Sequence, residues 1–253
     1  MTVAALPALA FAFMLVLCRA GAAVMLLPGF GENEPPAMLR AGFAVALTVL
    51  LLPEVQPMLP APPGDAWQLG RMVAAELATG AMLGWLARLV ALALPIAGQI
   101  VSYMLGLSNV LQNDVVFAGG STALNRLFGL AAPTLILASG LYELPLAALV
   151  GSYRLLPAGT MLASDDSARV AIAAVSDSFG LALQVAAPFV LAAIVWHAAL
   201  GLLSRLVTNL EVSILTQPAQ ILGGLALLSL LVAGLIGAWG IAAREMLSAL
   251  PGL

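Results

Sequence analysis

The chain has 253 residues, of which 62% are hydrophobic and only 8% are charged, and its mean hydropathy is +1.09. A soluble globular domain typically carries about 25% charged residues because its surface faces water. The composition therefore predicts an integral membrane protein. The nine basic residues are all arginine and the formal net charge is −3, so we expect no nucleic-acid binding, which usually needs a clustered basic surface. The single cysteine, Cys18, excludes an internal disulfide.

The N-terminal half contains three apolar stretches that we expect to form membrane helices, each of which needs about 20 residues to cross hydrocarbon. The first stretch is interrupted only by Arg19, and the third carries Glu76 and Arg88 among its residues. Between the second and the third, the repeated prolines from Pro53 to Asp65 predict an extended connector, because proline cannot continue a helix. The three predicted spans are residues 3–27, 38–52 and 67–94.

The C-terminal half adds three more predicted spans after an apolar stretch that continues past Pro95 and has an uncertain hairpin near Tyr103. Residues 164–178 alternate apolar and charged positions at helical spacing, which predicts an amphipathic helix start. The predicted spans are residues 124–150, 178–204 and 212–243. The sequence thus predicts an all-α integral membrane protein with about six long apolar helices and helical hairpins, in one membrane domain over residues 1–253.

A polar, glycine-rich loop over residues 106–123 interrupts the apolar pattern in the middle of the chain. Irregular backbone at membrane depth is tolerated only where it is buried in protein or lines a watery cavity. The alternative is an ordinary exposed loop between helices. The residues alone leave both interpretations open.

Ionisable groups inside apolar segments are costly in hydrocarbon and are therefore candidate functional residues. Such groups form a proton relay or substrate site in a transporter; otherwise each pairs with a neighbour, reaches an interface or faces a partner subunit. No face carries repeated carboxylates, and this pattern disfavours a proton relay. The candidates are Arg19, Glu76, Arg88, Glu143 and His197.

The sequence shows no pattern typical of an enzyme. His197 is the only histidine, which disfavours a metal site with several histidine ligands and a histidine-based catalytic dyad. A packing role with a hydrogen bond fits His197 better. Gly29–Gly31 lacks the preceding strand and the fingerprint of a nucleotide-binding loop. We therefore predict no enzymatic activity, no cofactor and no metal site.

Arginine in the loops between the predicted spans gives no clear membrane orientation. Cytoplasmic loops usually carry an excess of basic residues, but alternating the loops between two sides leaves similar numbers on both. One side receives Arg71, Arg154, Arg169 and Arg244, and the other receives Arg40, Arg126 and Arg205. Either the number of spans differs from six, or the chain does not sit in the bilayer as an independent multi-pass protein.

Several short blocks, in order between Met14 and Gly223, resemble those of the flagellar biosynthetic protein FliR family and its type III secretion counterparts. The sequence departs from the family pattern in several places. Gln99 stands where the family has an acidic residue, Met104–Ser108 replaces its QMGLS, the usual Asp-Pro after that motif is absent, and Gln217 precedes Pro218 where phenylalanine is usual. The blocks are Arg19–Gly21 with Leu27–Gly31, Gly98–Ser108, Leu155–Gly159 and Ala199–Arg205 with Gln217–Pro218.

The resemblance implies a structural subunit of the export gate, similar to a fused P–Q unit, in the bacterial inner membrane and the flagellar basal body. It implies P-type and Q-type subunits as partners, with B-type and A-type export components and membrane lipid, and secreted flagellar proteins passing through the assembly. Such an assembly is lifted largely out of the bilayer plane, which would account for the weak arginine bias. A stand-alone transporter or channel, and the equivalent subunit of a virulence-type system, are the alternatives.

The resemblance also implies a loop that helps plug the closed channel, corresponding to about Gly106–Gly120. Its apolar and glycine residues would pack across a pore, and its polar residues would hydrate the pore on opening. The plug candidates are Gly106, Leu107, Ser108, Asn109, Gln112, Asn113 and Asp114. The candidates for intramembrane polar or partner-facing roles are Arg19, Glu76, Arg88, His197 and Arg205.

Overall fold

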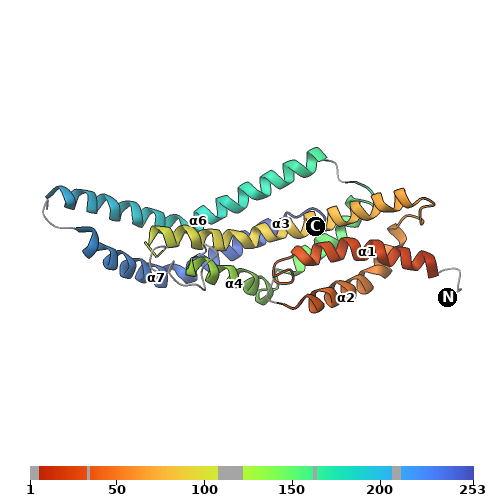
Figure 1. Ribbon diagram of the computed structural model, residues 1–253, viewed down its shortest axis with the longest axis horizontal. Helices are drawn as coiled ribbons and strands as arrows, with labels where there is room; N and C mark the ends of the chain where they lie inside the picture. The colour runs from red at the N-terminus through yellow and green to blue at the C-terminus, as the bar shows by residue number, and fades with distance from the viewer. Residues whose placement is uncertain (1–5, 33–34, 108–121, 162–163, 207–211) are drawn as a thin grey trace. The chain divides into compact units, whose positions relative to one another are not determined.

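The computed structural model describes residues 6–32, 35–107, 122–161, 164–206 and 212–253. All regular structure in these ranges is helical, as Figure 1 shows, so the predicted all-α class is confirmed. The helices are α1 (Leu6–Leu26), α2 (Ala37–Val55), the short 3-10 helix η2 (Gln56–Met58), α3 (Ala66–Met104), α4 (Ala123–Ala138), α5 (Glu143–Leu155), α6 (Ser164–Leu206) and α7 (Val212–Ser248).

Within the described ranges, five helices are long and apolar enough to cross a membrane: α1, α2 with η2, α3, α6 and α7. Their most apolar windows have mean hydropathies between 1.7 and 2.4. The pair formed by α4 and α5 is bent by 70° and provides a sixth span if it is counted as one broken helix. The prediction of about six apolar helices is confirmed, and the chain is a multi-pass membrane protein.

Proline interrupts fewer helices than the sequence analysis predicted. α3 continues through Pro95 to Met104, so the predicted break at residue 94 is wrong. α2 likewise runs through Pro53, and η2 follows it, so helix replaces the first part of the predicted extended connector. Proline removes one backbone hydrogen bond, whereas a complete break in hydrocarbon would leave several backbone groups without partners. The continuous helix is therefore the lower-energy solution.

The predicted span over residues 124–150 is two helices rather than one. α4 ends at Ala138 and α5 begins at Glu143. Between them, Gly140 has a φ of 77°, a left-handed conformation that glycine adopts without the penalty of a Cβ atom. The bend at this glycine separates two helices whose combined apolar pattern is continuous in the sequence.

The last two helices are longer than the spans predicted for them. α6 is one helix of 43 residues, so the predicted amphipathic start and the span that follows it form a single element. Asp165 and Asp166 lie in its first turn, where negative charge interacts favourably with the positive end of the helix dipole. α7 runs to Ser248, beyond the predicted end at residue 243, and includes Arg244.

Contacts between Cα atoms divide the chain into two compact units. The first comprises Met1–Val90, Pro133–Val175 and Arg244–Leu253, and the second comprises Ala91–Ala132 and Ser176–Ala243. Four helices, α3, α4, α6 and α7, pass from one unit to the other. The single membrane domain over residues 1–253 stays a prediction.

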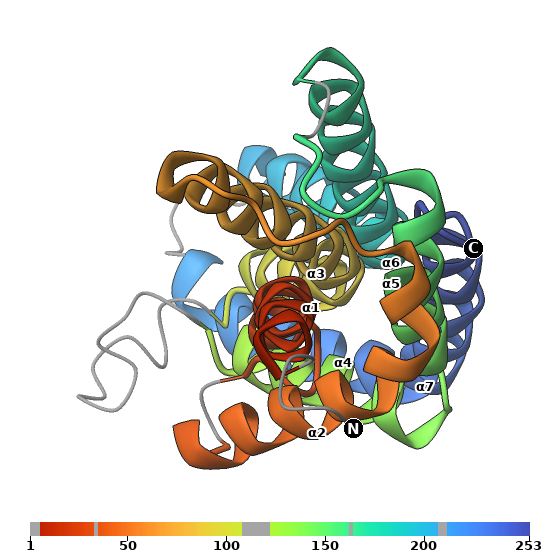
Figure 2. The same cartoon turned by 90° about the vertical axis from the view of Figure 1, so that its right-hand side faces the viewer.

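The core of the first unit forms where α1 lies among α2, α5 and the first half of α3, as Figure 2 shows from one end. α1 and α3 approach closely because Gly80 and Gly84 face the backbone of α1. A Cβ atom at Gly80 would collide with the carbonyl group of Arg19, and one at Gly84 with that of Ala23. Small residues four apart permit such close packing of membrane helices. The buried core residues are Val16, Ala20, Ala23, Leu51, Val55, Leu83, Leu149, Tyr153 and Ala158.

Large apolar side chains are exposed on several helices. On α2, Met38 is 84% exposed and Leu50 is 75% exposed, and on α7, Leu222 is 70% exposed and Leu230 is 78% exposed. Apolar faces of this kind mark surfaces that contact membrane lipid or other protein subunits.

Candidate functional site

Arg19 lies in the apolar helix α1, and its side chain is completely buried. The guanidinium has five N–H donors, and all five are used. Nε donates to Oε2 of Glu76 at 2.8 Å and Nη2 donates to Oε1 at 2.9 Å. Nη1 donates to the hydroxyl of Ser152 at 3.2 Å, and both Nη atoms donate to the carbonyl of Leu156 at 3.1 Å. Arg19 is therefore a fully paired cation.

Glu76, on α3, is also completely buried. Besides the two bonds from Arg19, its Oε1 accepts a hydrogen bond from the backbone N–H of Gly159 at 2.7 Å. The ring of Tyr153 lies 4.1 Å from the Arg19 guanidinium carbon, a cation–π contact worth about 2 kcal/mol when it is desolvated. We refer to the set Arg19, Glu76, Ser152, Tyr153, Leu156 and Gly159 as the Arg19 network.

The Arg19 network joins α1, α3 and α5 to the turn that follows α5. Leu156 is the C-cap of α5, and a cation beside the last carbonyls of a helix is favourable because that end carries partial negative charge. Gly159 adopts a φ of 80° in the turn, and this conformation directs its N–H toward Glu76. Two of the blocks that carry the family resemblance, Arg19–Gly21 and Leu155–Gly159, thus meet at Glu76.

The ion pair depends on the close approach of α1 and α3. Gly80 follows Glu76 by about one helical turn, and its missing side chain makes room for the backbone of Arg19 itself. The carboxylate can therefore reach the guanidinium without either helix moving aside. Neither side chain needs contact with water to satisfy its charge.

Arg88 forms a separate and more exposed pair. Its Nη2 lies 3.0 Å from Oε2 of Glu32, and these side chains are 26% and 22% exposed. Its Nη1 also donates to the carbonyl of Gly31 at 3.3 Å. Arg88 therefore holds the turn after α1 and does not join the Arg19 network.

The other ionisable candidates lie on α5 and α6, outside the Arg19 network. His197 is exposed on α6, with Nδ1 2.7 Å from the carbonyl of Ala193 one turn earlier. Arg205 is exposed in the last turn of α6, and Glu143 is exposed in the first turn of α5. Their proposed roles in facing a partner stay predictions.

The plug candidates fall mostly outside the described residues, since Ser108, Asn109 and the cluster 112–114 lie in the undescribed range 108–121. Gly106 and Leu107 are described and end α3. Gly106 has a φ of 72°, its N–H donates to the carbonyl of Tyr103, and that of Leu107 donates to the carbonyl of Ser102. This pattern is a Schellman motif, which satisfies the last carbonyls of a helix.

The sequence analysis missed the partners that complete the network: Ser152, Tyr153, Leu156 and Gly159. No local pattern identifies them, because they lie more than 130 residues from Arg19 and two of them contribute only backbone atoms. The one local pattern that could have pointed to them is the Leu-Pro-Ala-Gly sequence after α5, because proline and glycine at this spacing are typical of a turn.

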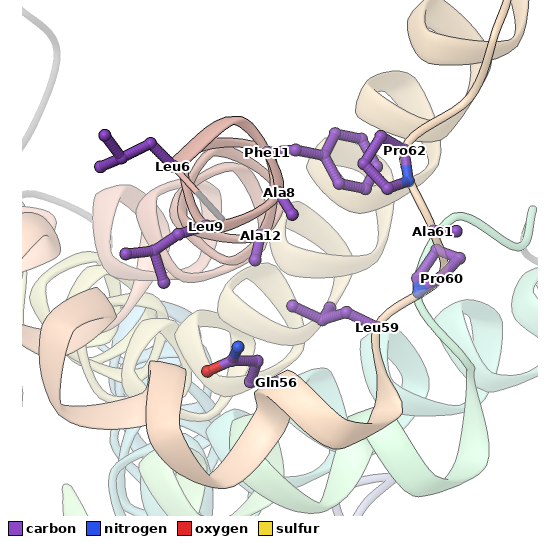
Figure 3. Close-up of a pocket in the computed structure, with 10 residues that line it drawn as sticks. All are labelled: Leu6, Ala8, Leu9, Phe11, Ala12, Gln56, Leu59, Pro60, Ala61 and Pro62. Atoms are coloured by element: carbon purple, nitrogen blue, oxygen red, sulfur yellow. The ribbon is translucent and has the colours of Figure 1, made fainter. Parts of the chain in front are cut away.

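An apolar groove of about 410 Å³ lies between the start of α1 and residues 59–62, as Figure 3 shows. Phe11 points toward Pro62 across it, and Gln56 is the one polar side chain among the ten that line it. A ligand site normally adds a few convergent polar groups to an apolar lining, and this groove lacks them. Among the residues that the structure describes, no group of three or more His, Cys, Asp or Glu side chains could hold a metal ion.

Comparison with known proteins agrees with the resemblance. The model of the family described as bacterial export proteins, family 1, matches residues 10–246. The flagellar biosynthetic protein FliR of Caulobacter vibrioides (strain ATCC 19089 / CIP 103742 / CB 15) is 34% identical over 233 residues, which are 92% of this chain and 93% of that protein. The protein of the same name from Bacillus subtilis (strain 168) is 26% identical over 215 residues, or 83% and 82% of the two chains. The chain therefore belongs to family 1 of the bacterial export proteins, the family of the flagellar biosynthetic protein FliR.

Proposed function

We propose that this protein is a structural subunit of the flagellar type III protein export gate in the bacterial inner membrane. Family membership supports a component of the flagellar export apparatus. The observation that carries the structural role is the Arg19 network, in which every donor of the buried cation is occupied by the protein itself. Such a site holds helices together and leaves no group free for a substrate.

The stand-alone transporter fits the described residues less well. It would need a mid-membrane substrate site built from Glu76, Arg88 and His197. Glu76 is occupied by Arg19 and Gly159, Arg88 is paired with Glu32, and His197 contacts its own helix. Each candidate therefore has a local partner, and no observation favours a shared substrate among them.

We propose that partner subunits cover the exposed apolar faces. α7 has the most apolar window of the five candidate spans, with mean hydropathy 2.4, and only 11% of that window is buried. P-type and Q-type gate subunits, together with lipid, would cover such faces, and B-type and A-type components would adjoin the assembly. The connection between α3 and α4 would help plug the closed channel, and secreted flagellar proteins would pass when it opens. The subunit itself would carry out no enzymatic reaction.

A secretion assay in a strain that lacks this chain tests the proposal. We expect loss of flagellar protein secretion and of motility, with both restored by the wild-type chain. Neutralising Glu76, Arg88 and His197 one at a time separates the transporter from the gate. Loss of small-solute uptake in reconstituted vesicles with normal motility in all three variants would contradict the gate. Loss of virulence-protein secretion with normal motility would instead indicate the virulence-type system.

A further inference from the structure

Residues 249–253 follow α7 and lie against α5, within the first compact unit. The N–H groups of Ala249, Leu250 and Leu253 each donate to the carbonyl three residues earlier, at 3.3 Å. Pro251 lies in this turn, and proline is common just after a helix because it cannot continue one. Leu250 is only 7% exposed and anchors the segment in the protein. We refer to residues 249–253 as the closing turn.

The contact between the closing turn and α5 is made by backbone atoms. A Cβ atom at Gly252 would collide with the carbonyl of Ala148, and one at Gly151 would collide with the carbonyl of Gly252. Gly252 also has a φ of 109°, a conformation that glycine adopts without penalty. The two glycines therefore meet backbone to backbone, and a larger residue at either position would push α5 and the turn apart.

The part of α5 that the closing turn touches also supplies the Arg19 network. A Cβ atom at Gly252 would lie 2.9 Å from the backbone N of Ser152, and the hydroxyl of Ser152 accepts from Arg19. Tyr153 comes next in the chain, and the carbonyl of Leu156 follows Ser152 by about one helical turn. α5 has only 13 residues, and an isolated helix of this length is marginally stable. Its position therefore depends on the elements that hold it.

We propose that the closing turn is a latch that positions α5, so that the buried ion pair keeps its full set of partners only while the latch is docked. Gly151 and Ser152 are neighbours on α5 and point about 100° apart around the helix. The latch thus holds one face of α5 while the Arg19 network holds another. This role lies within the first unit and is independent of the protein's part in export.

Alanine at two helical glycines, Gly151 and Gly42, gives a matched pair with opposite expected outcomes. An alanine that fits makes a helix interior more stable than glycine does. At Gly42, on α2, an added Cβ would meet no described atom within 4 Å apart from its own helix backbone, so Gly42→Ala should keep or raise stability. Gly151→Ala should lower stability because the new Cβ atom pushes the latch away. If both variants were as stable as wild type or more so, the latch would not be in close contact with α5.

Hydrogen exchange on the purified full chain measures the state of the network. The backbone N–H of Gly159, in the turn that follows α5, donates to Glu76. We expect Gly151→Ala to speed exchange at Gly159 at least about tenfold, because a hydrogen bond to a charged group is weakened when α5 shifts. The amide of Leu51, in the buried core on α2, is the internal reference. If exchange at Gly159 and at Leu51 rose by the same factor, the latch would add stability without positioning α5.

Leu250→Ala keeps the test decisive where Gly151→Ala does not fold. This change weakens the anchor of the closing turn and adds no atom that could collide with α5. It should also speed exchange at Gly159 more than at Leu51. Unchanged exchange at Gly159 in a folded Leu250→Ala chain would overturn the latch.

A double-mutant cycle separates positioning from simple packing. The double variant Arg19→Met with Glu76→Gln has no ion pair for α5 to meet, so a loosened latch has less to disturb. Denaturant titration should show that Leu250→Ala raises the unfolding equilibrium constant at least about threefold more in the wild-type chain than in this double variant. Equal increases in the two backgrounds would contradict a latch that acts through the Arg19 network.

Discussion

Breaking the Arg19–Glu76 pair from one side should destabilise the protein far more than removing both charges. Arg19→Met leaves the buried Glu76 carboxylate with the Gly159 N–H as its remaining described donor. Glu76→Gln leaves the buried guanidinium without its counter-charge. Each single variant should lose about 3–5 kcal/mol of unfolding free energy, because an uncompensated buried charge is costly. That is a large share of a total stability of about 5–15 kcal/mol.

The double variant Arg19→Met with Glu76→Gln should be more stable than either single variant. It contains no buried charge, and the glutamine can still accept the Gly159 N–H. Ser152 keeps its bond to the carbonyl of Leu149 at 2.7 Å, so the groups left without their former partners are the Leu156 carbonyl, an acceptor, and the N–H2 of the new glutamine, a donor. One unpaired buried group costs about 1–3 kcal/mol. The sign of the interaction term in this double-mutant cycle is therefore the informative result.

Denaturant titration of the purified chain in detergent, followed by tryptophan fluorescence, measures these differences. Arg88→Met is the matched control, since it removes an arginine from a partly exposed pair on α3 and should cost no more than about 1 kcal/mol. If both single variants lay within about 1 kcal/mol of wild type, or if their losses simply added in the double variant, the network would not carry the stability assigned to it.

Three further substitutions test the packing around the Arg19 network and at the end of α3 by the same titration. Gly80→Ala should cost about 1–3 kcal/mol because its Cβ atom would force α1 away from α3, and a neutral result would show that the helices are not in close contact. Tyr153→Phe should leave stability unchanged or raise it, because the buried hydroxyl has no hydrogen-bond partner in the described structure; a loss above about 1 kcal/mol would indicate a partner. Gly106→Ala should cost about 1–2 kcal/mol through its φ of 72° and speed exchange at Leu107, and normal exchange would contradict the Schellman turn.

The fold class could be predicted because it depends on composition and apolar length, which are local properties of the sequence. The breaks between helices were harder. Pro95 suggested an end that the structure does not have, and Gly140 marks a bend that the sequence analysis overlooked. The two errors have different causes. The cost of unpaired backbone in hydrocarbon favours continuing a helix through proline. A glycine permits a turn, but its presence in an apolar stretch does not by itself predict one.

The candidate site could be predicted only in part. Arg19 and Glu76 were singled out because charges in apolar segments are costly, but their pairing across 57 residues was not visible. The contributions of Leu156 and Gly159 come from backbone atoms, for which residue type carries little signal. Gly252 was missed for a similar reason, since its contact with α5 is made by backbone atoms.

Co-expression of the tagged chain with P-type and Q-type subunits tests the central claim most directly. The account predicts that the tagged wild-type chain retrieves both subunits in one complex from detergent-solubilised membranes, and that Arg19→Met retrieves markedly less. A wild-type chain that purifies as a stable monomer without either subunit would contradict its assignment to the export gate.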